Sequence, residues 1–484
     1  MSQDAKSEAR RTLDERRAAA ERAEAATLWE DAAREYEACL SLMAGGEDGE
    51  AEAGLLTALG RCYWYDGQAR PAWRTLRRAI GLCRERGDGV GMAAATWEIL
   101  RIWGPPDRQR AMADEALEAL GDADPHLRAL LLLGSRRMEE AIAIGEAHQF
   151  PDLLTARTQE VAWKALDEGR AEEYLRLLRQ VYETSVGLGR HDMASGQLRG
   201  MGFAMMEIGR LGDGMALAEE SLAYADRTHL RFQAQLALMD LVGAAFARCE
   251  FERCEELLAR TPGEVDFRAD LYRMWMALHR GEIGEGMRLL VEPERGGRTP
   301  TAVSQIHAAA AGMLFAAGQE EAARRELLAW AEVSRQWESF AEEAAAPGDC
   351  LVALADDRLA AEVRDAFAER DRARKLPIRY STLQGRGVDE VRGALALRLG
   401  LLDEAGAYFG AGVEWAEREE CSVDAGRCVA GLGRVALRRE RRDEAREEFG
   451  RAAARFEGCG AVYELRRVRR EMEDMGGPAG GAGG

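Results

Sequence analysis

Apolar and small residues recur along most of this chain with the spacing of an α-helix. In the stretch Gly431–Phe456, Gly433 precedes Ala445 by twelve residues, and Phe449 and Ala452 follow at steps of four and three. Residues three and four apart share one face of a helix, so this pattern predicts an amphipathic helix with a buried face of small residues and one aromatic. Gly433 belongs to a preceding helix, and a turn is expected between the two.

The same pattern recurs in Leu55–Cys83, Gly202–Ala225 and Val391–Ala416. The corresponding small residues are Gly60, Ala72 and Ala79 in the first stretch, Gly202, Gly214 and Ser221 in the second, and Gly393, Ala405 and Gly412 in the third. A leucine at such a position would overpack a close helix crossing at a cost of roughly 1 to 3 kcal/mol. The pattern therefore predicts a repeated hairpin of two closely packed helices.

A residue that tolerates positive φ is expected where the first helix of each hairpin ends. Candidate positions recur at intervals of 30 to 44 residues: Thr27, Gly67, Gly104, Gly134, Gly169, Gly209, Cys249, Gly281, Gly318, Asp356, Gly400 and Glu440. The surroundings of Gly104, Gly134 and Asp356 match the repeat only in part. About twelve helical hairpins and an all-α fold follow from this count.

This pattern closely resembles the tetratricopeptide repeat, in which two antiparallel helices meet at small residues. The resemblance implies a right-handed superhelical solenoid of stacked hairpins. Intervals near 40 residues exceed the common period of about 34 and are similar to the long-period arrays of bacterial signalling regulators of the maltose-activator type. Those arrays serve an attached ATPase and a DNA-binding domain, but this chain has no G-x-x-x-x-G-K-[ST] phosphate loop and no evident helix-turn-helix. The resemblance implies a scaffold or sensor role and no functional residue.

Five segments are expected from the distribution of charge, glycine and proline. They are a charged N-terminal cap (1–20), a repeat array (21–374), an irregular segment (375–390), a C-terminal repeat pair with a capping helix (391–475) and a disordered glycine-rich tail (476–484). The irregular segment breaks the helical pattern with polar residues and glycines. It is interpreted either as a hinge with few buried contacts or as a docked loop.

Composition narrows the classes of partner and compartment. The net charge of −19 disfavours nucleic acid and anionic membranes, because both attract clustered cations. No apolar run approaches the length of a membrane helix, and the first residues form no apolar signal core. Nine scattered cysteines suggest no disulfide framework. We expect a soluble, cytoplasmic protein.

The sequence contains few candidates for catalytic or cofactor chemistry. Two G-x-G-x-x-A matches, Gly89–Ala94 and Gly431–Ala436, follow no predicted strand, which a dinucleotide site requires. Six single histidines show no metal-ligand spacing. The cysteine pairs Cys249 with Cys254 and Cys421 with Cys428 are interpreted as packing residues. A protein with no catalytic residue, cofactor or metal is the prediction.

The helical pattern also predicts which residues line the inner, concave face of the array. These candidate partner-binding residues are Arg61, Trp64, Trp163, Arg199, Phe203, Met206 and Trp275. Rigid aromatic side chains are common binding anchors, so the surface from Trp163 to Trp275 is predicted to hold an extended or helical peptide. The competing interpretation is that these aromatics pack in the core of a tightly wound superhelix.

The function expected from the sequence is a non-enzymatic scaffold that binds a protein or peptide in its concave groove. Two alternatives remain open: a ligand-sensing module of a bacterial signalling or transcription system, and an enzyme with an unrecognised cleft. The sequence does not determine the partner or the oligomeric state.

Overall fold

Helices make up almost all of the regular structure. The computed structural model describes residues 3–43, 49–102, 106–261, 267–291, 300–335, 345, 347–373, 375, 379–381 and 386–476. Within them the first helices are α1 (Gln3–Ala25), α2 (Trp29–Met43), α3 (Gly49–Tyr65), α4 (Ala69–Arg86), α5 (Gly89–Leu100), α6 (Pro106–Leu120), α7 (Pro125–Gly134), α8 (Met138–His148), α9 (Pro151–Asp167), α10 (Ala171–Gly187), α11 (His191–Glu207) and α12 (Leu211–Arg227).

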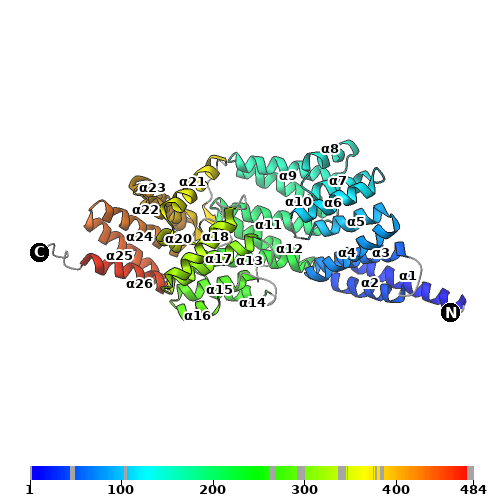
Figure 1. The fold of residues 1–484 in the computed structure, drawn as a ribbon, viewed down its shortest axis with the longest axis horizontal. Coiled ribbons are helices and arrows are strands. Elements are labelled where there is room, and N and C mark those ends of the chain that lie inside the picture. The colour runs from blue at the N-terminus through cyan, green and yellow to red at the C-terminus, as the bar shows by residue number, and fades with distance from the viewer. Residues whose placement is uncertain are drawn as a thin grey trace. The chain divides into compact units, whose positions relative to one another are not determined.

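The later helices are α13 (Arg231–Ala247), α14 (Phe251–Ala259), α15 (Phe267–His279), α16 (Ile283–Arg288), α17 (Pro300–Ala316), α18 (Glu320–Arg335), α20 (Gly348–Leu354), α21 (Asp357–Ala373), α22 (Val388–Arg398), α23 (Leu402–Arg418), α24 (Ser422–Arg438), α25 (Arg442–Gly458) and α26 (Val462–Gly476). Consecutive helices such as α17 and α18, or α24 and α25, pair as hairpins (Figure 1). The predicted all-α fold of repeated helical hairpins is confirmed.

Most hairpin turns lie where the glycine and small-residue pattern predicted them. Positive φ occurs at Thr27, Gly67, Gly169, Gly209, Cys249, Gly281, Gly318, Gly400 and Glu440. Two predicted positions were wrong. Gly134 is the last residue of α7 and the positive φ falls on Arg136, whereas Asp356 follows an extended Ala355 with no left-handed residue in that turn. Gly104 lies outside the described residues.

Small residues permit the close helix crossings that the sequence predicted. A Cβ atom placed on Gly60 would lie 2.5 Å from Cγ of Leu76, and one on Gly393 would lie 2.7 Å from the ring of Phe409. Both large side chains are fully buried. Each glycine thus faces the bulky residue of the partner helix, and a side chain there would force that residue to move.

The chain forms two compact units. The first comprises Met1–Ala165, Glu172–Leu198 and Glu220–Leu236, and the second comprises Leu166–Ala171, Arg199–Glu219 and Ala237–Gly484. The boundaries of these two units differ from those of the five segments expected from the sequence. The five segments stay predictions.

The first unit holds a buried polar contact within its apolar core. The guanidinium of Arg101 donates hydrogen bonds to Glu98 at 2.8 Å, to Asp192 and to the hydroxyl of Tyr65. The Tyr65 hydroxyl in turn donates to Asp192 at 3.1 Å. This network links α3, α5 and α11. Every member has a partner, so no charge is left isolated in the core.

In the second unit, the described part of the irregular segment contains a short antiparallel ladder. Strand β1 (Tyr380–Ser381) pairs with β2 (Arg386–Gly387), with Tyr380 opposite Gly387. The sequence predicted no strand, so this ladder is a correction to a purely helical chain. The ladder forms where the helical pattern is broken, because main-chain groups that no helix satisfies need other partners. The Arg379 N–H donates to the Glu207 carbonyl at 2.8 Å, and the Gly387 N–H donates to Asp424 at 3.0 Å.

Candidate partner-binding site

Two of the seven predicted partner-binding residues are core residues. Trp64 is 6% exposed and its ring packs 4.5 Å from that of Phe232, while Met206 is fully buried. The helical spacing placed both on an inner face, but it does not reveal which neighbouring side chains cover that face. Neither residue has a free surface, so the prediction that they contact a partner is corrected.

The two predicted arginines are engaged in ion pairs. Arg61 donates to Glu24 at 2.7 Å and to Glu98 at 3.3 Å in the first unit. In the second unit Arg199 pairs with Asp240 at 2.7 Å and lies over the half-buried ring of Phe203, with its guanidinium 5.9 Å from the ring centre. A partner's acidic group would have to compete with these carboxylates.

The two predicted tryptophans keep accessible surface. Trp163, in the first unit, is 41% exposed and its ring lies 5.1 Å from that of Tyr174. Trp275, in the second unit, is half-buried on α15 and its ring lies 6.1 Å from that of Phe246. The two tryptophans belong to different units.

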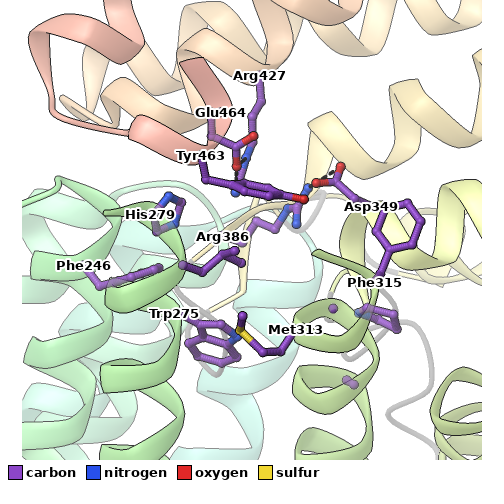
Figure 2. A pocket seen from close by; sticks show the side chains of 14 residues that line it. Phe246, Trp275, His279, Met313, Phe315, Asp349, Arg386, Arg427, Tyr463 and Glu464 are labelled. Carbon is purple, nitrogen blue, oxygen red and sulfur yellow. Dashed lines mark hydrogen bonds and ion pairs between the residues drawn. The ribbon is translucent and has the colours of Figure 1, made fainter. Parts of the chain in front are cut away.

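Trp275 borders a cavity of about 70 Å³, which we name the Trp275 cavity (Figure 2). Segments far apart in sequence contribute to it. The lining residues are Phe246, Trp275, Leu278, His279, Ala308, Gly312, Met313, Phe315, Pro347, Asp349, Arg386, Arg427, Tyr463 and Glu464. Figure 2 shows Trp275 and Met313 on one side and Arg427, Glu464 and Asp349 on the other. One wall of the cavity is therefore apolar and the other is ionic.

The ionic wall is held by pairs that connect several elements. Arg427 on α24 donates to Glu464 on α26 with its Nε at 2.9 Å, and Arg467 on α26 pairs with Asp349 on α20. Arg386 on β2 pairs with Glu390 and lies 3.8 Å from Asp349. Each charge has a partner of opposite sign, which offsets the cost of placing these ions in a partly buried site.

These pairs also hold the carboxylates in their ionised form. Burial alone would raise the pKa of Asp349, but the nearby Arg467 and Arg386 outweigh it and hold the pKa well below its usual range. The pKa of Glu464 is likewise lowered, because Arg427 and Arg467 outweigh burial. Both carboxylates are therefore charged at neutral pH.

Two other buried groups behave differently. Burial raises the pKa of Asp424 to about 6, although Arg427 and Arg386 lie nearby. Burial, reinforced by Arg427, lowers the pKa of His279 to about 3, so its imidazole is neutral at physiological pH. His279 is 5% exposed, and its Nδ1 has no hydrogen-bond partner in the described residues. A buried polar atom without a partner is costly and marks a place where a ligand could supply one.

Helical spacing in the sequence points to Trp275, but to neither His279 nor the ionic wall. Acid and arginine pairs occur throughout the chain, so their spacing alone predicts nothing. A usable signal lies in α24, where Asp424 and Arg427 interrupt a half-helix of otherwise small and apolar residues. Charges on a helix that is apolar on all sides indicate a buried ion pair or a functional site.

The described residues contain neither a cluster of metal-ligating side chains nor a membrane-spanning helix. They contain no cluster of three or more histidine, cysteine, aspartate or glutamate side chains able to hold an ion. None of the helices in the described ranges is long and apolar enough to cross a bilayer.

Comparison with known proteins finds similarity only among solved structures. No family model matches the chain, and no curated protein does. The APC/C hetero-tetramer Cut9-Hcn1 is 13% identical over 96% of this chain and 91% of that chain, with a TM-score of 0.42. Yeast Tom70 is 12% identical over 96% and 95%, with a TM-score of 0.30, and the P58(IPK) TPR domain is 12% identical over 96% and 98%, with a TM-score of 0.26.

At this identity and with these TM-scores, the likenesses assign no function to the chain. None of the three is a regulator of the maltose-activator type, so that part of the resemblance stays a prediction.

Proposed function

We propose that this chain is a non-enzymatic scaffold that binds a protein partner by seating one side chain of a partner segment in the Trp275 cavity. The observation that carries the proposal is a cavity with an apolar wall of Trp275 and Met313, which is also lined by the buried and neutral His279. Helical hairpin arrays commonly present such surfaces to extended or helical peptides.

The size of the cavity favours a side chain over a free small molecule. Sites for cofactors and drug-sized ligands enclose roughly 300 to 1,000 Å³. The Trp275 cavity measures about 70 Å³, which suits one anchoring side chain whose main chain lies outside. Binding energy in such interfaces concentrates in a few anchors of this kind.

The chemistry of the walls favours a neutral anchor. Asp349, Arg386, Arg427 and Glu464 already pair with oppositely charged residues, so a charged side chain would have to displace an existing pair. Trp275 and Met313 offer apolar contact, and His279 beside them is uncharged. We therefore expect an apolar side chain as the anchor.

The test uses random peptides displayed on phage and selected on the immobilised full chain. A Cβ atom on Gly312, which lines the cavity on α17, would meet no atom within 4 Å, so Gly312→Leu fills the cavity without crowding the helix. Gly410→Leu is a matched control, because Gly410 is also half-buried within a helix and has open space at its Cβ.

Selected peptides are expected to share a neutral apolar anchor. Their affinity should fall at least about tenfold for Gly312→Leu, a loss of about 1.4 kcal/mol, and stay unchanged for Gly410→Leu. Equal binding to wild type and both variants, or no enrichment of any peptide, would contradict the proposal.

A further inference from the structure

Two of the nine cysteines differ from the rest in both exposure and surroundings. Cys39, Cys62, Cys83, Cys254, Cys350, Cys421 and Cys428 are buried, whereas Cys249 and Cys459 are only half-buried. These two are more than two hundred residues apart in the sequence, yet their thiols lie within hydrogen-bonding reach of each other in the second unit. The two least buried cysteines are thus also neighbours.

Turns at two hairpins bring the thiols together. Cys249 has φ 61° between α13 and α14, and Cys459 follows the last residue of α25. Both side chains pack against the same apolar cluster, which includes Val423, Phe456 and Ala461. The pairing therefore belongs to the packed structure and does not depend on a free chain end.

We propose that Cys249 and Cys459 are a modification site, a dithiol that a peroxide oxidises to a reversible disulfide. A cytoplasmic location is expected from the sequence, and in that reducing compartment disulfides are typically transient and redox-sensing. Redox-sensing cysteines are accessible, acidic and close to a second thiol that resolves the oxidised form.

The environment gives the two thiols different roles. A hydrogen bond from the Cys249 thiol, outweighing burial, lowers the pKa of Cys459 to about 7, and the main chain at Ala461 assists. That same hydrogen bond raises the pKa of Cys249. Cys459 is accordingly the more acidic thiol of the pair and the attacking group, and Cys249 keeps its proton longer.

Oxidation proceeds in two balanced steps. The Cys459 thiolate attacks one oxygen of hydrogen peroxide, the O–O bond breaks, and the products are a sulfenic acid and a hydroxide that takes up a proton to become water. The Cys459 anion that raised the pKa of Cys249 is then gone. Cys249 loses its proton and attacks Sγ of Cys459, the S–O bond breaks, and a second water leaves. Two thiols and one peroxide yield one disulfide and two waters.

The cross-link would join the α13–α14 turn to the α25–α26 turn. A bond between residues so distant in sequence restricts the unfolded chain strongly, so the oxidised protein should unfold at a higher temperature than the reduced one. The proposal concerns the thiols alone and does not depend on partner binding.

The experiment treats the reduced full chain with equimolar hydrogen peroxide, followed by digestion and mass spectrometry without reductant. The expected product is one cross-linked peptide pair that contains Cys249 and Cys459, with the other seven cysteines still thiols, and dithiothreitol should reverse it. Before oxidation, iodoacetamide at pH 7.5 should label Cys459 about tenfold faster than any other cysteine.

Two variants separate the roles. Cys249→Ser should stop the reaction at a sulfenic acid on Cys459, which dimedone traps, and Cys459→Ser should leave Cys249 as a thiol at the same peroxide dose. Circular dichroism checks that both variants keep the wild-type helix content. Cross-links to other cysteines or between molecules, or unchanged thiols in folded wild-type protein, would overturn the proposal.

Discussion

The hydroxyl of Tyr380 donates a hydrogen bond to the main-chain carbonyl of Gly243 at 2.6 Å, and the Tyr380 side chain is fully buried. This contact joins the irregular segment to α13, 137 residues earlier in the chain. Of the two interpretations left open by the sequence, a hinge or a docked loop, the described residues of this segment favour the docked loop.

Tyr380 is therefore expected to contribute strongly to stability. Tyr380→Phe should lower the free energy of unfolding by about 1 kcal/mol, because it removes one hydrogen bond and keeps the ring. Tyr380→Ala should cost about 3 to 5 kcal/mol, because it also leaves a cavity. Urea denaturation measures both changes. Hydrogen exchange at Tyr380 and Gly387 as fast as in an unfolded chain would support a hinge instead.

The close helix crossings can be tested with two glycines in neighbouring helices. Gly393→Ala would place a Cβ atom 2.7 Å from the buried ring of Phe409, so we expect a loss of about 1 to 3 kcal/mol. Gly410→Ala meets no atom within 4 Å and should stabilise the chain by about 0.5 to 1 kcal/mol through helix propensity. Thermal denaturation measures the stability of both variants. Stability changes of the same sign in the two variants would contradict the proposed close packing at Gly393.

Asp424 should make stability depend on pH in a definite direction. Its pKa of about 6 is above the unfolded value, so the folded state holds the proton more tightly. The resulting stabilisation is complete below about pH 4 and is lost as pH rises through about 6, a change of about 2 to 3 kcal/mol.

Asp424→Asn isolates this effect from other carboxylates. The asparagine oxygen can still accept the hydrogen bond from Gly387, but it carries no charge to bury. The stability of the variant relative to wild type should therefore increase between pH 4 and pH 7. A difference that does not change with pH in denaturant titrations would show that Asp424 does not titrate in this window.

The two tryptophans that keep accessible surface, Trp163 and Trp275, give a prediction for binding. Trp275→Ala should weaken the binding of a selected peptide by about 2 kcal/mol or more, because the substitution removes the aromatic side of the cavity. The affinity of Trp163→Ala for the same peptide is measured as well, because the sequence predicted both Trp163 and Trp275 as anchors. Trp73, half-buried in the first unit, provides a matched control. Isothermal titration calorimetry measures each variant, and an effect of Trp73→Ala equal to that of Trp275→Ala would argue against a specific anchor.

The sequence predicts the repeat well and the site only in part. Gly60 and Gly393 signal close crossings because local sterics alone require small residues there. Trp275 follows from helical spacing. His279, Arg386 and Glu464 could not be predicted as neighbours, since their proximity depends on how α15, β2 and α26 meet in the folded unit. Trp64 is the reverse case: helical spacing predicted it as a partner-binding residue, but its ring packs against Phe232 in the core.

The structure of the chain bound to a selected peptide tests the central proposal most directly. We expect an apolar peptide side chain in contact with Trp275 and Met313. A peptide bound elsewhere on the chain, with no side chain in the Trp275 cavity, would contradict it.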